Sequence, residues 1–149
     1  MENIGRVELR QLNIDDFEEL KKSSDEAYAD WPEEQWNIKE IRKLLKIFPE
    51  GQIAAVVDGV VVGSALSIIV KYELFGDDHT YDEITGKGSY NTHNPKGNTL
   101  YGIDIFIRPD YRGMRLGRRL YDARKELCEN LNLKAIVFCG RIPNYHKFS

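Results

Sequence analysis

The residues with the clearest potential for chemistry lie in one segment, IDIFIRPDYRGMRLGRRLYDARKELC, at positions 103–128. A run of apolar residues ends at Pro109, a basic turn that contains Gly113 follows, and from Leu116 onward apolar residues recur at helical spacing. The first backbone N–H groups of a helix have no partner inside it, and the helix dipole places about half a positive charge there. The segment therefore predicts a site for an anion such as phosphate or pyrophosphate.

The charge of this segment supports the same interpretation. Between Arg108 and Lys125 it holds seven basic and two acidic residues, whereas the 149-residue chain has 21 basic and 24 acidic residues and a net charge of -3. Guanidinium groups bind phosphate well, so the local excess favours a small polyanion over nucleic acid. The simpler alternative is a solvated basic helix face behind a glycine turn. The segment is neither a Walker loop nor the dinucleotide fingerprint with three spaced glycines.

The remaining sequence predicts the elements that position this segment. Strands are expected at 7–12, 52–57, 60–71, 101–107 and 135–139, and helices after Asn13, at 38–47 and at 116–130. Asp58-Gly59 between two β-rich runs indicates a tight hairpin, and the final strand–helix–strand order requires a parallel crossover. We therefore expect one α/β (α+β) domain over residues 1–149, with a mixed, mostly antiparallel sheet and helices on both faces.

The turn that precedes the last helix resembles a known ligand loop. Residues Arg112–Gly117 are similar to the acetyl-CoA-binding loop of the GNAT N-acetyltransferase superfamily, Gln/Arg-x-x-Gly-x-Gly/Ala, with Arg115 where the family usually has a glycine. VELRQLNIDDFEEL resembles the family's first strand and helix, and VVDGVVVGSAL its second hairpin. The stretch from Thr80 to His146 also resembles the acetyltransferase-like module that precedes a nitrilase-like amidohydrolase in some fused bacterial proteins.

The resemblance implies acetyl-CoA as co-substrate, and neither a metal nor a covalent enzyme intermediate. The pantetheine would pair with the strand backbone at Ile105, Phe106 and Ile107, where that strand separates from its parallel neighbour. The pyrophosphate would bind the backbone N–H groups of the loop, which belong to Arg112, Gly113, Met114, Arg115, Leu116, Gly117 and Arg118.

Acyl transfer to an amine also needs a base and an acid. Asp104 is the candidate base, because an acidic residue between Ile103 and Ile105 is unusual in a strand; the alternative is a structural partner for an arginine or a backbone group. Tyr145, beyond the last strand, is the candidate acid, a role that the family often gives to a tyrosine farther along the chain.

A polar segment at 73–98 is a long inserted loop, and such loops are usually functional or mobile. Its residues Asp82, Glu83 and His93 could close over an acceptor, although solvated loop residues are the simpler interpretation. His79 follows two aspartates but has too few companions to predict a metal site.

The aromatic and sulfur-containing residues give weaker signals. Trp36 is interpreted as core, whereas Trp31, before a proline in an expected loop, is the better candidate for a ring that faces a ligand. Cys128 and Cys139 exclude a disulfide framework and are interpreted as core residues. With no signal peptide and no apolar stretch long enough for a membrane span, the prediction is a cytoplasmic protein without membrane or nucleic-acid partners.

The family normally continues with a helix and two more strands, so we expect a C-terminally truncated GNAT-like domain. An exposed sheet edge would favour pairing with a second copy as a homodimer. The resemblance to the fused module implies a fused or separate hydrolase as partner. The leading prediction is an N-acetyltransferase that acts on an amine of a small molecule or peptide. The alternatives are a non-catalytic acetyl-CoA-binding or docking module for a partner enzyme, and a plain nucleotide- or phosphate-binding module.

Overall fold

The computed structural model describes residues 6–30, 36–72, 90 and 92–138. The strands are β1 (Val7–Gln11), β2 (Ile53–Val57), β3 (Val60–Val70), β4 (Thr99–Ile107) and β5 (Ala135–Phe138). The helices are α1 (Phe17–Ala27), α2 (Ile38–Ile47) and α4 (Leu116–Asn130), with short 3-10 turns at Ile14–Asp16, Pro49–Gly51 and Pro109–Met114. This order of strands and helices is the predicted one.

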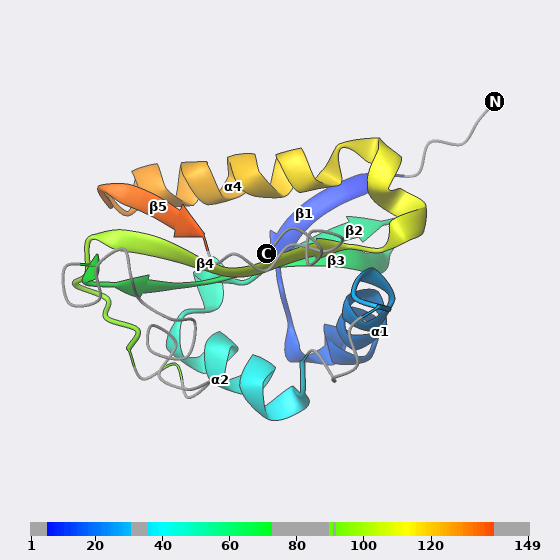
Figure 1. Ribbon diagram of the computed structural model, residues 1–149, viewed down its shortest axis with the longest axis horizontal. Coiled ribbons are helices and arrows are strands. Elements are labelled where there is room, and N and C mark those ends of the chain that lie inside the picture. The colour runs from blue at the N-terminus through cyan, green and yellow to red at the C-terminus, as the bar shows by residue number, and fades with distance from the viewer. Residues whose placement is uncertain (1–5, 31–35, 73–89, 91, 139–149) are drawn as a thin grey trace.

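Within these residues the strands form one sheet in the order β1-β2-β3-β4-β5. All neighbours are antiparallel except β4 and β5, which are parallel. Helices α1 and α2 lie on one face of the sheet, and α4 covers the other (Figure 1). The predicted fold class, including the final crossover, is confirmed. No helix in the described ranges is long and apolar enough to cross a membrane.

Local sequence explains where the first helical segments begin. Asn13 and Asn37 each cap such a segment, and a carboxylate three residues later, from Asp16 or Glu40, binds the N–H of the capping residue in return. Both are capping boxes, and both satisfy backbone groups that would otherwise lack partners. The cap predicted for Asn13 is therefore confirmed.

The hairpin between β2 and β3 turns at Asp58 and Gly59, which both have positive φ, of 52° and 84°. The pairing then shifts, because Ala55 faces Gly63 while Val56 faces Val61, so β3 carries an extra residue, Val62, beside Gly63. Gly63 is required there for space as well. A Cβ at this position would lie 2.4 Å from the backbone oxygen of Phe106.

A second register shift lies between β3 and β4. Leu66 faces Asp104 while Ser67 faces Gly102, which leaves Ile103 as an extra residue in β4. The inserted residue breaks the alternation of the strand. As a result, three residues of β4 face α1 and α2: Ile103, Asp104 and Phe106. Ile105 faces the other way and packs in the cluster beneath α4.

We expect Gly63→Ala to lower the free energy of unfolding by about 1–3 kcal/mol, because the added Cβ collides with the backbone of β4. Gly113→Ala is the matched control, since a Cβ there meets nothing within 4 Å, and its effect should stay within about 0.5 kcal/mol. Urea denaturation of both variants measures the difference. Equal stabilities would contradict the close approach at Gly63.

Candidate active site

Asp104 is buried, with 3% of its surface exposed, and its carboxylate is fully engaged. The Tyr28 hydroxyl donates to Oδ1, and the N–H of Ile105 donates to the same oxygen at 2.9 Å. The Trp36 indole Nε1 donates to Oδ2 at 2.9 Å. These contacts agree with the structural alternative considered for Asp104, while its role as a base stays a prediction.

The two aromatic donors to Asp104 flank the connection between α1 and α2. Tyr28 is the C-cap of α1, and Trp36 directly precedes Asn37, the N-cap of α2. Trp36 is 1% exposed, which confirms its interpretation as a core residue. No local pattern in the sequence predicts these hydrogen bonds, because their donors lie 76 and 68 positions before the aspartate.

Further aromatic contacts shield this carboxylate. The ring of Trp36 stacks with Tyr90 at a centroid distance of 6.4 Å, and Tyr28 meets Phe106 edge to face at 6.2 Å. Tyr90 has a φ of 58°, a left-handed conformation that non-glycine residues rarely adopt. The cluster thus surrounds Asp104 with rings that hold its hydrogen bonds away from water.

Directly across β4 from this cluster lies Arg124, a buried residue of α4. Its Nη2 donates to the carbonyl oxygens of Leu66 at 2.7 Å and of Asp104 at 2.6 Å, and its Nε donates to the Ser67 hydroxyl at 3.1 Å. Burial lowers the pKa of Arg124 to about 10, and the charge of Asp104 opposes that shift. At neutral pH the guanidinium is therefore a buried cation.

Arg124 is one of the seven basic residues between Arg108 and Lys125 that favoured an anion site, and its buried position removes it from that group. A signal was present, because Arg124 follows Leu120 by four residues and precedes Cys128 by four. All three lie on the buried face of α4. Cys128 is a buried free cysteine, as expected, while Cys139 lies outside the described residues.

The predicted ligand loop leads from the end of β4 into α4. A 3-10 turn at Pro109–Met114 is followed by Arg115, whose φ of 58° puts it in the left-handed region. The family's usual glycine at this position is explained by that backbone conformation. The Arg119 N–H donates to the Arg115 carbonyl at 3.1 Å, so the preceding amides form the open N-terminus of α4.

The start of α4 has the features that a diphosphate requires. Its first turn holds no acidic residue, and Arg115 makes no side-chain capping bond. A Cβ at Gly113 or at Gly117 would meet nothing within 4 Å, so open space lies beside the backbone there. The side chains of Arg115, Arg118 and Arg119 are exposed. Positive charge at a helix N-terminus is unfavourable without an anion, and these residues therefore fit an anionic group.

Two other arginines near the loop bind protein groups. Arg108 donates through Nε to the Ser23 hydroxyl at 2.7 Å, and Arg112 donates through Nη2 to the Ala27 carbonyl at 3.4 Å. Both contacts join the end of β4 and the following turn to α1. The backbone of Arg112 stays part of the predicted loop, while its side chain has a structural contact.

The strand half of the predicted site is Ile105, Phe106 and Ile107. Among the described residues β4 pairs with β5 only from Thr99 to Gly102, and its later residues pair with β3 alone. The described β5 ends at Phe138. On its β5 side, the strand therefore has backbone groups without a described strand partner at Ile105 and Ile107, two of the three predicted positions. The carbonyl of Phe106 points toward β3 instead.

His93 has a structural contact. Its Nδ1 accepts the N–H of Ile69 at 3.0 Å, and its ring stacks on Phe48 at 5.0 Å. Burial lowers the pKa of His93, and the charge of Glu50 opposes this in part. The neutral imidazole is the form that can accept at Nδ1.

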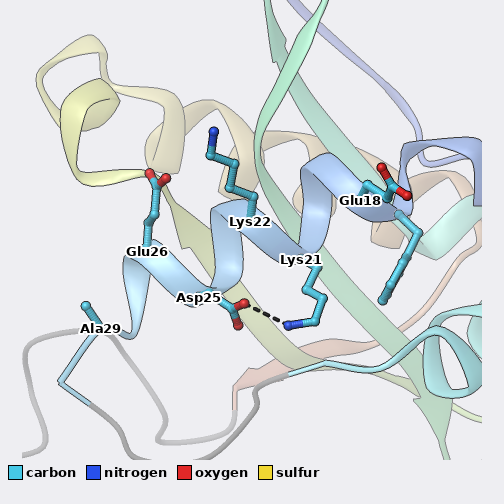
Figure 2. A pocket seen from close by; sticks show the side chains of 7 residues that line it. Glu18, Lys21, Lys22, Asp25, Glu26 and Ala29 are labelled. Atoms are coloured by element: carbon cyan, nitrogen blue, oxygen red, sulfur yellow. Dashed lines mark hydrogen bonds and ion pairs between the residues drawn. The ribbon is translucent and has the colours of Figure 1, made fainter.

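The outer side of α1 carries a groove (Figure 2). Its lining comes from the outer side of α1 and the residue Ala29, with Lys21 bound to Asp25 at 2.8 Å. Acidic and basic side chains alternate along it, including Glu18, Lys22 and Glu26. The groove contains none of the predicted site residues.

Several predicted residues lie outside the described part of the chain. They are Tyr145, Asp82, Glu83, His79 and Trp31. Of Met114, only the backbone is described. Within the described ranges no three potential metal ligands come together.

The sequence model described as "Acetyltransferase (GNAT) family" matches residues 7–147. This chain belongs to that family of acyltransferase enzymes, as the resemblance of its loop, first helix and hairpin predicted.

Two curated relatives are proteins of Bacillus subtilis (strain 168). "Uncharacterized N-acetyltransferase YkwB" is 34% identical over 143 residues, which cover 95% of this chain and 63% of that protein. "Probable hydrolase YhcX" is 44% identical over 116 residues, which cover 78% of this chain and 23% of that protein. The chain thus spans less than two thirds of the length of either relative, and the second agrees with the expected resemblance to a hydrolase-fused module.

Solved structures share the fold. The loading GNATL domain of CurA from Lyngbya majuscula superposes with a TM-score of 0.77 at 21% identity, covering 97% of this chain and 69% of that chain. The GphF GNAT-like decarboxylase, solved in complex with isobutyryl-CoA, gives a TM-score of 0.65 at 19% identity, covering 95% and 71%.

We expect Arg115→Gly to raise the free energy of unfolding by about 0.5–1 kcal/mol. Glycine adopts the left-handed conformation without the cost of about 1–2 kcal/mol that other residues incur. The greater chain entropy of glycine in the unfolded state offsets roughly 0.5–1 kcal/mol of this gain. Asn132→Gly is the control, because Asn132 has a φ of 57° and asparagine tolerates it better. Thermal unfolding compares the two, and a destabilised Arg115→Gly would contradict the argument.

The contact of His93 predicts a pH dependence of stability. A folded-state pKa below the ordinary 6.5 means that the unfolded chain binds the proton more tightly, so stability falls as pH drops below about 6.5 toward the lowered value. His93→Asn keeps an acceptor near the Nδ1 position and cannot titrate. Denaturation midpoints of His93→Asn, measured from pH 5 to 8, should equal those of the wild type at high pH and exceed them at low pH. A constant difference would show that His93 does not titrate in this way.

Proposed function

We propose that this chain is an N-acetyltransferase domain that transfers an acetyl group from acetyl-CoA to an amine of a small molecule or peptide. The observation that supports the proposal is the open and basic N-terminus of α4, which a short turn connects to a strand whose end has backbone groups without a described strand partner. Membership in an acetyltransferase family supports the reaction class.

In this proposal the loop from Arg112 to Arg118 binds the diphosphate through backbone N–H groups and exposed guanidinium groups. The backbone of β4 from Ile105 to Ile107 would bind the pantetheine by strand-like pairing. A β4 N–H would then stabilise negative charge on the thioester oxygen. The two binding segments are held together because only Arg108 and the 3-10 turn at Pro109–Met114 connect β4 to Arg115.

The reaction requires the amine to lose a proton, its nitrogen to form the C–N bond, and the C–S bond to break with a proton passing to the departing thiolate. A lysine-like amine has a pKa near 10.4, so deprotonation at pH 7 costs about 4–5 kcal/mol. Asp104 is our candidate to accept that proton, and Tyr145 to protonate the thiolate. To act as base, Asp104 would have to exchange one of its three described hydrogen bonds.

A second function is favoured by one comparison. This chain spans 23% of a relative named as a probable hydrolase and is 44% identical to it over the matched region. This similarity is what we expect of a non-catalytic acetyl-CoA-binding module that docks on or regulates a hydrolase. Binding without transfer to any amine would select this function.

The experiment that tests the binding site uses Gly117→Asp. The position is open, and an acidic residue in the first turn of α4 favours the folded helix, so the variant should remain folded. The new carboxylate would repel the diphosphate and weaken acetyl-CoA binding by about tenfold or more, which is about 1.4 kcal/mol. Calorimetry with acetyl-CoA, CoA and ATP measures affinity, and an acetyl-transfer assay over an amine panel measures turnover.

Gly117→Asn is the matched control, because it has the same size without the charge and should weaken binding less. Wild-type protein that releases no heat with acetyl-CoA or CoA would refute the proposal. Binding of ATP as tight as that of CoA would favour the phosphate-binding module instead. Unchanged turnover in Asp104→Asn would exclude Asp104 as base.

A further inference from the structure

The geometry points to Arg124 as a positioning residue of the acyl-transfer site: its guanidinium fixes the bulge of β4 and so sets the strand backbone at Ile105–Ile107 relative to the N-terminus of α4. This inference rests on the proposed function. It assigns to Arg124 no contact with substrate, and it concerns how one buried side chain determines the shape of a site on two elements.

The contacts of Arg124 surround the register shift between β3 and β4. The register shift separates the pair Leu66–Asp104 from the pair Ser67–Gly102. Arg124 donates to the carbonyl of Leu66, to the carbonyl of Asp104 and to the hydroxyl of Ser67. A bulge disrupts the ladder of strand hydrogen bonds locally. All three acceptors therefore belong to the residues around that disruption, and one side chain binds both strands there.

Arg124 and Asp104 are also oppositely charged and both buried. Arg124 is a buried cation and Asp104 a buried carboxylate, yet they lie on opposite faces of β4 and are joined through the Asp104 backbone carbonyl. Each charge lowers the electrostatic cost of burying the other. Arg124 is thus matched to the conformation in which Asp104 faces Tyr28 and Trp36, and that conformation exists because Ile103 is inserted.

Helix α4 connects Arg124 to the proposed diphosphate site. Arg124 lies eight residues after Leu116, which is about 12 Å along a straight helix at 1.5 Å per residue. The same helix therefore offers its open N-terminus to the proposed diphosphate and, two turns later, binds β4 beside the proposed pantetheine positions. A rigid element that bears both contacts fixes the distance between the two halves of the ligand site.

The alternative is a buried arginine that stabilises the fold in general, and the chain offers a matched control for it. Gln52 is also fully buried and also bridges groups around Ser67, donating to its carbonyl at 2.8 Å and accepting its N–H at 3.0 Å. The described contacts of the Gln52 side chain involve β3 and Phe48, with none to β4. Gln52→Met thus removes a buried polar bridge to Ser67 on the β3 side of the bulge, without removing any described contact to β4, the strand that carries the extra residue.

The test compares Arg124→Met, Arg124→Lys and Gln52→Met by amide hydrogen exchange, acetyl-CoA affinity and kcat. In Arg124→Met we expect two amides to exchange at least tenfold faster than in Gln52→Met at equal global stability. They are the Ile105 amide, which donates to Asp104 Oδ1, and the Phe106 amide, which lies in the pairing with Ser64. We also expect kcat of the folded protein to fall by about 10²-fold, the effect of a misplacement near 1 Å. Arg124→Lys should be intermediate, because an ammonium cannot reproduce the guanidinium fork.

Identical exchange and kcat in Arg124→Met and Gln52→Met at matched stability would overturn the proposal. If Arg124→Met does not fold, Arg124→Lys decides by the same criteria. The exchange measurement needs no substrate, so it separates two failures. Fast exchange in β4 of Arg124→Met, together with wild-type protein that neither binds acetyl-CoA nor transfers acetyl groups, would leave Arg124 as the residue that fixes the bulge but refute its part in acyl transfer.

Discussion

One inserted residue in β4 determines how this domain presents its polar groups. With Ile103 added, the strand directs Asp104 toward α1 and α2, and the backbone at that point turns its carbonyl toward Arg124. A regular strand would alternate through this region and would place the carboxylate against α4. The aromatic donors on one face and the buried guanidinium on the other are compatible only with the shifted register.

The bulge also explains why distant parts of the chain meet. The connection between α1 and α2 is held at Tyr28 and Trp36, and both donate to the same carboxylate. Arg108 and Arg112, which follow β4, bind the Ser23 hydroxyl and the Ala27 carbonyl of α1. β4 is thus joined to α1 on one face of the sheet and to α4 on the other, the two faces that helices cover in Figure 1.

The sequence predicted those features that depend on local patterns. Helix spacing defined α4 from Leu116, Asn13 defined a cap, and Asp58-Gly59 defined a hairpin, because each is decided by neighbours a few positions away. The extra residue in β4 and the partners of Asp104 could not be predicted, since they depend on strands and helices far apart in the chain. Arg124 illustrates the limit: its spacing indicated the buried face of α4, but only its acceptors explain why a charge lies there.

The first turn of α4 has a practical consequence. It lacks a carboxylate and an N-terminal capping bond from Arg115, while exposed guanidinium groups surround open backbone amides. Such a site attracts any multivalent anion in solution, not one ligand alone. Phosphate and sulfate buffers would therefore act as weak competitors, and apparent affinities measured in them would differ from those in a buffer with only monovalent ions.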